Sequence, residues 1–173
     1  RLKESEERFK QMAGITNEWI WEVDKNGLYI YSSDSVRDIL GYSPREIVGK
    51  KYFYDFFHPS VKKALKQGAL KAFKKKQPIE NLLNLNVHKK GRNVLLSTSG
   101  VPLLDKEGKL KGYRGSDIDV TEKKEAEKSL KLFRELMDAS TDSVFLIDAK
   151  TGKFVDVNKS AEKNTGYKRD ELL

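Results

Sequence analysis

The sequence predicts an α+β fold in which a run of helices is inserted in an antiparallel sheet. Two segments that alternate apolar and polar residues come first, several helical segments follow, and three more strand-like segments close the unit. Short polar turns join neighbouring strand-like segments, as in antiparallel hairpins. This order of elements is typical of α+β domains and not of parallel βαβ folds.

The first elements are a hairpin and two short helices. Residues Trp19–Asp24 alternate large apolar side chains with polar or smaller ones, which predicts a strand. The turn Asp24–Gly27 contains Asn-Gly, a strong hairpin signal, and a second strand follows. The first short helix is expected to end at Gly41, and the second to begin at Ser43 with Glu46 completing a capping box.

A longer helix and three strands complete the predicted unit. The helix is expected from about Ser60 to Lys75, directly after a run of aromatic residues. Its predicted apolar stripe is formed by Val61, Leu65, Ala69 and Ala72. The turns KKGR and DKEG then separate three segments with the composition of strands.

An internal repeat divides the chain. Phe9 matches Phe133, and the Gly-Tyr pair that contains Tyr42 recurs with Tyr167. The matches fall at apolar, turn and cap positions. We therefore expect four parts, which are an N-terminal flanking helix (1–15), a complete domain (16–120), a linker helix (121–138) and the truncated start of a second domain (139–173).

The motifs NG, LGYSPREIVGK, HPS, KKGR and VPLLDKEGKLKGYRGSDIDVTEKK resemble, in this order, the PAS sensory domain family with its C-terminal extension. The resemblance covers about Glu7–Lys124 in full and Phe133–Leu173 as a second unit. It implies a five-stranded antiparallel sheet with helices on one face, a small pocket between them, and amphipathic flanking helices. It also implies a sensory module of a cytoplasmic signalling protein, whose parent is a histidine kinase or, as second choice, a diguanylate cyclase.

Composition limits the other functions. The net charge is +8, but acidic residues are interleaved with the lysines, so no nucleic-acid partner is expected. The absence of cysteine excludes disulfides, thiolate metal sites and cysteine-linked flavin chemistry. The apolar runs are far shorter than a membrane span, so no membrane contact is expected.

No catalytic or metal-binding set is recognisable. The two histidines, His58 and His88, are far apart in the sequence, and His88 is expected to be a solvated turn residue. The sequence has no glycine-rich phosphate loop. We therefore expect no enzyme activity from these residues.

The pocket that the resemblance implies has five candidate lining residues. They are Trp21, Tyr42, Phe53, Phe57 and His58. Each has an alternative role, core packing or a dimer interface for the aromatic residues and helix capping for the histidine. An unknown small molecule is a possible partner of this pocket.

The cofactor is left open. A haem-binding PAS domain carries a ligating histidine in the long helix, and this helix has none, which argues against haem. A non-covalent flavin remains possible, because Trp19 or Trp21 could stack on its ring system.

The predicted exit from the domain is Asp119, Val120 and Thr121. This segment resembles the D-I-T exit motif of PAS domains, with valine in place of isoleucine, and it places a helix cap directly after the last strand. A cap there fixes the point at which strand becomes helix, so a shift in the sheet would reach the linker helix. The alternative is a plain helix cap without a role in signalling.

A homodimer is expected through the flanking helices. Leu2, Phe9 and Met12 belong to one short heptad seam, and Leu130, Phe133 and Met137 belong to another. Each seam is too short to hold a coiled coil alone. The alternative to this dimer is that each helix folds back on its own domain. The alternative to ligand sensing is a structural dimerisation or protein-interaction domain without a small ligand.

Overall fold

The computed structural model describes residues 18–173, which form two compact units that meet at Thr121 and Glu122. The first unit is described from residue 18 and the second is Glu122–Leu173. The expected N-terminal helix, with Leu2, Phe9 and Met12, lies outside the described residues.

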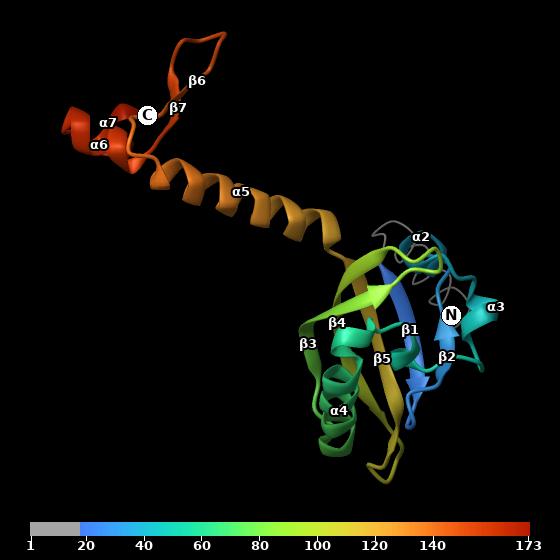
Figure 1. The fold of residues 1–173 in the computed structure, drawn as a ribbon. Coiled ribbons are helices and arrows are strands. Elements are labelled where there is room, and N and C mark those ends of the chain that lie inside the picture. The colour runs from blue at the N-terminus through green and yellow to red at the C-terminus, as the bar shows by residue number, and fades with distance from the viewer. Residues whose placement is uncertain (1–17) are drawn as a thin grey trace, which may run out of the picture. The chain divides into compact units, whose positions relative to one another are not determined.

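The first unit is built on one five-stranded antiparallel sheet (Figure 1). Its strands lie in the order β2-β1-β5-β4-β3, so the last strand along the chain is the central one. The bounds are β1 Trp19–Asp24, β2 Tyr29–Ser32, β3 Ile79–Val87, β4 Asn93–Leu104 and β5 Leu110–Asp119. This sheet confirms the expected α+β class.

The helical run between β2 and β3 packs against this sheet on one side (Figure 1). Its elements are α2 Val36–Leu40, α3 Pro44–Ile47, the 3-10 turn η1 Phe53–Asp55 and α4 Pro59–Lys75. The capping box of α3 is present, since the Glu46 carboxylate accepts hydrogen bonds from the Ser43 amide at 2.8 Å and hydroxyl at 3.0 Å. The expected helix insertion is therefore confirmed.

The core lies between the helices and the inner face of the sheet. In β1 the alternate residues Trp19, Trp21 and Val23 are buried, as the alternation predicts. Across the sheet, Tyr113 of β5 stacks on Phe73 of α4 with ring centroids 4.0 Å apart. The expected α4 stripe was wrong in leaving out Phe73, which is among the most buried residues of this helix because it meets the Tyr113 ring.

The β1–β2 turn depends on Gly27. Its φ is +89°, in the region that side chains disfavour, and the Asp24 carboxylate accepts hydrogen bonds from the Asn26 and Leu28 amides. A Cβ added at Gly27 would lie 2.5 Å from the Phe53 ring. The turn therefore needs glycine both for its backbone and for the approach of Phe53.

The second unit repeats the first elements of the fold. Its elements are α5 Thr121–Ala139, β6 Phe145–Ile147, β7 Phe154–Val157, α6 Lys159–Thr165 and α7 Arg169–Leu172. The Asn158 carboxamide accepts a hydrogen bond from the Val144 amide at 2.9 Å, as the Ser33 hydroxyl does from Ile20 in the first unit. The two copies thus share a hydrogen bond at matching positions of their hairpins.

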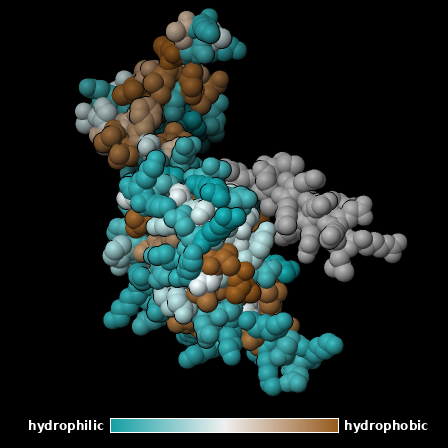
Figure 2. Space-filling model, turned by 90° about the vertical axis from the view of Figure 1, so that its right-hand side faces the viewer, coloured by the Kyte–Doolittle hydropathy of each residue, from teal (hydrophilic) through white to brown (hydrophobic). Residues whose placement is uncertain are grey.

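The second unit leaves apolar side chains on its surface. Its sheet has only the strands β6 and β7, and Ile147, Phe154 and Val155 are exposed. Figure 2 shows hydrophobic side chains gathered over this unit, at the top of the view. A surface of this kind is typical of a region that meets a partner or further chain.

Within residues 18–173, no helix combines the length and the apolar content that a bilayer span requires.

Candidate functional site

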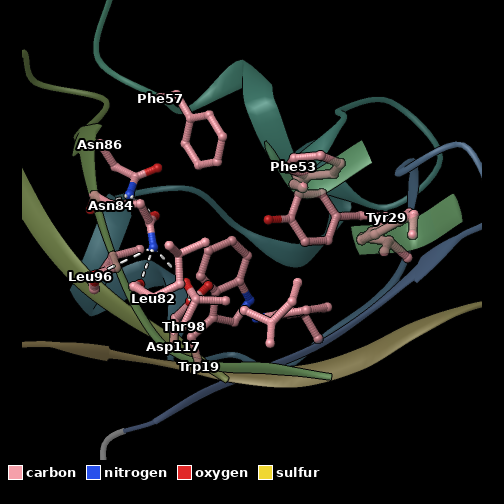
Figure 3. A pocket seen from close by; sticks show the side chains of 15 residues that line it. Trp19, Tyr29, Phe53, Phe57, Leu82, Asn84, Asn86, Leu96, Thr98 and Asp117 are labelled. Carbon is pink, nitrogen blue, oxygen red and sulfur yellow. Dashed lines mark hydrogen bonds between the residues drawn. The ribbon is translucent and has the colours of Figure 1, made fainter. Parts of the chain in front are cut away.

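The candidate site is a cavity between the sheet and the helices of the first unit (Figure 3). Its volume is about 40 Å³. This is space for roughly three water molecules. The walls come from all five strands, η1, its following loop and α4, and are formed by Trp19, Trp21, Val23, Tyr29, Phe53, Phe57, Ala69, Phe73, Ile79, Leu82, Asn84, Asn86, Leu96, Thr98 and Asp117.

A line of hydrogen-bonded polar side chains crosses one wall of the cavity. The Asn86 carboxamide nitrogen donates to the Asn84 oxygen at 2.6 Å, and the Asn84 nitrogen donates to the Thr98 hydroxyl at 2.7 Å. The Thr98 hydroxyl donates in turn to the Asp117 carboxylate. The Asn84 nitrogen also donates to the Leu82 and Leu96 carbonyl oxygens (Figure 3). The series of side-chain hydrogen bonds therefore ends at a single carboxyl group, that of Asp117.

Asp117 is the polar end of this line, and it is buried. Burial raises the pKa of its carboxyl to about 7, against the lowering effect of the Thr98 hydroxyl and the Trp21 indole. Among residues 18–173, no lysine, arginine or histidine forms an ion pair with this carboxylate. The site therefore holds a buried acid with a raised pKa, and no cation among the described residues is fixed beside it.

Trp21 lies over a floor of two glycines. It is in register with Gly115 of β5, which is in register with Gly100 of β4. A Cβ on Gly115 would stand 2.7 Å from the Trp21 ring, and one on Gly100 would stand 3.1 Å from it. The buried indole N–H of Trp21 has no hydrogen-bond partner, although it favours the charged form of Asp117. An unpaired buried N–H costs free energy, so the wall presents an unused donor.

Three of the five predicted lining residues lie at the cavity. Trp21, Phe53 and Phe57 line it. Tyr42 does not line it, and its ring packs instead against Phe56 with centroids 5.1 Å apart. His58 is also outside the lining, and its Nδ1 accepts a hydrogen bond from the Ser60 amide at the start of α4.

Sequence reasoning missed the polar wall. Asn84 and Asn86 alternate with outward residues in β3, in phase with Leu82, and Asp117 is in phase with the buried Tyr113 in β5. That phase was a usable signal, since polar residues on the buried face of a strand need partners.

The other histidine is not solvated as expected. His88 is buried, with 9% of its surface exposed, because its ring packs on the backbone at Gly41. Burial and the neighbouring Arg92 and Lys90 lower the pKa of its imidazole. Its Nδ1 accepts a hydrogen bond from the Lys90 amide, so it braces the β3–β4 turn away from the cavity.

The predicted exit segment is tied to the sheet. The Asp119 carboxylate accepts a hydrogen bond from the Thr121 amide at 2.9 Å, and the Thr121 hydroxyl accepts one from the Leu95 amide of β4 at 2.9 Å. The Val120 amide donates to the Leu95 carbonyl oxygen. The first residue of α5 is thus fastened to two neighbouring strands.

The described dimer candidates lie on α5. Leu130 and Phe133 are exposed, with 66% and 45% of their surface accessible, and Leu136 adjoins them. Met137, the last member of the same seam, is buried within the second unit. The exposed part of the seam is therefore shorter than the sequence alone suggests.

The cavity does not fit a flavin. The three fused rings of an isoalloxazine are several times larger than the roughly three water molecules for which this cavity has space. Trp19 and Trp21, the expected stacking partners, are buried in the wall and pack with other core residues. In the described residues, no group of three metal-ligating side chains is assembled either.

Comparison with known proteins places this architecture. The chain is 28% identical, over 126 residues, to an uncharacterized protein, y4lL, of Sinorhizobium fredii; the match covers 73% of the chain and 15% of that relative. A sensory box histidine kinase/response regulator from Burkholderia thailandensis has a similar solved structure, with 24% identity, a TM-score of 0.59 and coverage of 75% of this chain and 96% of that one. The solved N-terminal domain of a diguanylate cyclase with a PAS/PAC sensor from Marinobacter aquaeolei is also similar. It has 14% identity and a TM-score of 0.55, and the match covers 61% of this chain and 97% of that one.

Two family models match this chain directly. Both are described as the PAS fold, one over residues 29–116 and the other over residues 131–173. The first match alone spans half of the chain, and it contains the helical run, α4 and most of the sheet. The chain therefore belongs to the PAS family.

Proposed function

We propose that the first unit is a sensory module that binds a small molecule in its cavity and passes the response through α5 to an output domain elsewhere in a longer protein. The observation that carries this proposal is the cavity itself. It combines aromatic walls, a directed line of hydrogen bonds ending at Asp117, and the unpaired N–H of Trp21. Purely structural cores are not expected to leave a polar line of this kind incomplete.

The route from the cavity to the helix is short. Asp117 and Asp119 belong to the same strand, β5, two residues apart. This separation is about 7 Å along a strand. Thr121, bonded to both Asp119 and β4, begins α5. A displacement of β5 at Asp117 would therefore reach the first turn of α5 without crossing a flexible loop.

The output domain proposed first is a histidine kinase, and the second choice is a diguanylate cyclase. The support is the likeness to a sensory box histidine kinase and to the PAS/PAC region of a diguanylate cyclase. The chain spans 15% of the length of the curated relative named above, which leaves ample length for such a domain in proteins of this kind.

Native mass spectrometry of the gently purified chain tests the ligand part of the proposal. The expected result is an added mass that disappears in Ala69→Phe, which fills the cavity from α4. Gly68→Ala is the matched control, since nothing lies within 4 Å of a Cβ there. A chain that carries no added mass, even after incubation with a metabolite extract, would contradict ligand sensing and favour a purely structural domain.

A homodimer through α5 is the second part of the proposal, and the exposed Leu130 and Phe133 favour it. Sedimentation of the chain should give a dimer at micromolar concentration and a monomer for Leu130→Glu plus Phe133→Glu. Lys123→Gln plus Lys128→Gln, on the same helix, is the control, because it lowers the net charge by the same two units. A dimer that survives the first double substitution would place the interface elsewhere.

A further inference from the structure

We propose that the cavity binds a small primary organic ammonium ion, whose charged group pairs with the Asp117 carboxylate while its alkyl part lies among the aromatic rings. This inference names the ligand class of the sensory site and therefore rests on the proposed function. It depends on the charge, the hydrogen-bond direction, the aromatic walls and the size of the cavity.

Charge is the first argument. The chain carries 34 lysines and arginines, yet among the described residues none pairs with Asp117. A buried carboxylate without a cation is unfavourable, and a cation brought by a ligand relieves this cost. Without the Asp117 carboxylate, the cavity would have no reason to favour a cation over a neutral molecule.

The hydrogen bonds point in one direction. Asn86 donates to Asn84, Asn84 to Thr98, and Thr98 to Asp117. The Trp21 N–H, which has no hydrogen-bond partner, favours the charged form of the same carboxyl. Thr98 is thus the hydrogen-bond donor that the protein gives to Asp117, and an ammonium group in the cavity would supply a further one.

The aromatic rings suit a cation. Trp19, Trp21, Tyr29, Phe53 and Phe57 line the cavity, and the faces of such rings attract positive charge. Figure 3 shows the Tyr29 hydroxyl pointing into the cavity. The raised pKa of this phenol, caused first by burial and then by the negative charge of Asp117, keeps the hydroxyl neutral and able to accept a hydrogen bond from an ammonium.

Size limits the ligand to a few carbon atoms. The volume of about 40 Å³ excludes ring systems and long chains. A quaternary ammonium could not donate to Asp117, whereas a primary one has three N–H donors for Asp117 and its neighbours. The class is therefore a short alkylammonium ion.

Tryptophan fluorescence provides a local assay. The chain has two tryptophans, and both line the cavity. Titration of the complete chain with n-propylammonium at pH 8 should change this fluorescence with an affinity at least tenfold tighter than that for n-propanol. Asp117→Asn should lose this preference, and Glu80→Gln, an exposed carboxylate on β3, should retain it. Between pH 8 and pH 6 the affinity of the parent chain should fall about tenfold, as Asp117 takes up a proton.

Three outcomes would overturn the assignment. Equal affinities for the amine and the alcohol would show a cavity for neutral molecules, and the proposed sensory function would stand without the ammonium class. Amine binding that persists in Asp117→Asn would place the cation elsewhere. If neither compound changes the fluorescence at high millimolar concentration, the short-ammonium assignment fails, and native mass spectrometry, which does not depend on the compound chosen, decides the sensory function separately.

Discussion

Replacing Asp117 by asparagine should make the first unit more stable, by an amount that increases with pH. The carboxyl is fully buried, and its pKa is about 7 in the folded chain against 3.8 for the unfolded one. Below about pH 4 both states hold the proton, so the group contributes no difference. Between pH 4 and 7 the unfolded state releases its proton while the folded state retains it, and the free energy of unfolding of the parent chain therefore decreases.

The size of the effect follows from the shift. The rise of the pKa from 3.8 in the unfolded chain to about 7 corresponds to about 4 kcal/mol at pH 8. The carboxamide introduced by Asp117→Asn does not titrate, while its oxygen can still accept a hydrogen bond from Thr98. The difference in unfolding free energy between Asp117→Asn and the parent should therefore rise by up to about 4 kcal/mol from pH 4 to pH 8.

Urea unfolding followed by tryptophan fluorescence measures this difference for the first unit alone, because both tryptophans belong to β1. Glu80→Gln has the same change of charge on the surface, so its difference from the parent should stay nearly constant with pH. A difference for Asp117→Asn that is also constant from pH 4 to pH 8 would contradict a raised pKa, since the carboxyl would then titrate as in the unfolded chain.

Three further changes test the fold around the site. Gly27→Val should lower the free energy of unfolding, measured in urea, by about 2–4 kcal/mol, clearly more than Gly49→Val does. Both positions have positive φ, but a Cβ at Gly27 would also meet the Phe53 ring. Equal losses of stability would mean that the Phe53 contact is unimportant. Gly115→Ala should destabilise the first unit by at least about 2 kcal/mol and shift the Trp21 emission. Gly68→Ala, where a Cβ on α4 would meet nothing within 4 Å, should be neutral or slightly stabilising. An unchanged emission spectrum in Gly115→Ala would contradict the close packing of Trp21 on β5. Asn158→Ala should increase amide exchange throughout the second unit by at least tenfold and leave the first unit unchanged. The reason is that the buried carboxamide donates to Met137 and Asp142 and accepts from Val144 and Ala161. Protection retained in α6 and β7 would show that these hydrogen bonds are not needed for the stability of the second unit.

The fold could be predicted largely from local signals. The alternation in β1, the Asn-Gly turn, and the glycine and capping-box signals around α2 and α3 each act within a few residues, and the structure places all of them as expected. The PAS resemblance added the arrangement of the strands in the sheet, which the family and structural comparisons support. Local chemistry and the family pattern agree because turns and caps are short-range features.

The site could be predicted only in part. Phe53 and Phe57 were found because their aromatic run exceeds what a short segment normally buries, and both line the cavity. Tyr42 was also predicted to line the cavity, but in the structure its ring packs against Phe56 instead. The phase of Asp117 in β5 indicates the buried face, but its place at the end of the polar line depends on the pairing of β4 with β5, which brings Thr98 to it.

The burial of His88 could not be predicted from the sequence either. Its position beside a polar lysine turn predicts exposure, but tertiary packing on Gly41 buries it. Long-range contacts therefore decide the environment of each functional side chain, while local patterns decide the elements that carry them.

The proposed function requires that a ligand bound in the cavity changes the stability of the first turn of α5. Amide exchange of the first turn of α5, residues 121–126, tests it most directly, measured with n-propylammonium at the concentration that saturates the tryptophan signal. We expect slower exchange in this turn for the parent chain and no change for Asp117→Asn at the same concentration. A saturated tryptophan signal with unchanged exchange in residues 121–126 would contradict coupling between the cavity and the exit helix.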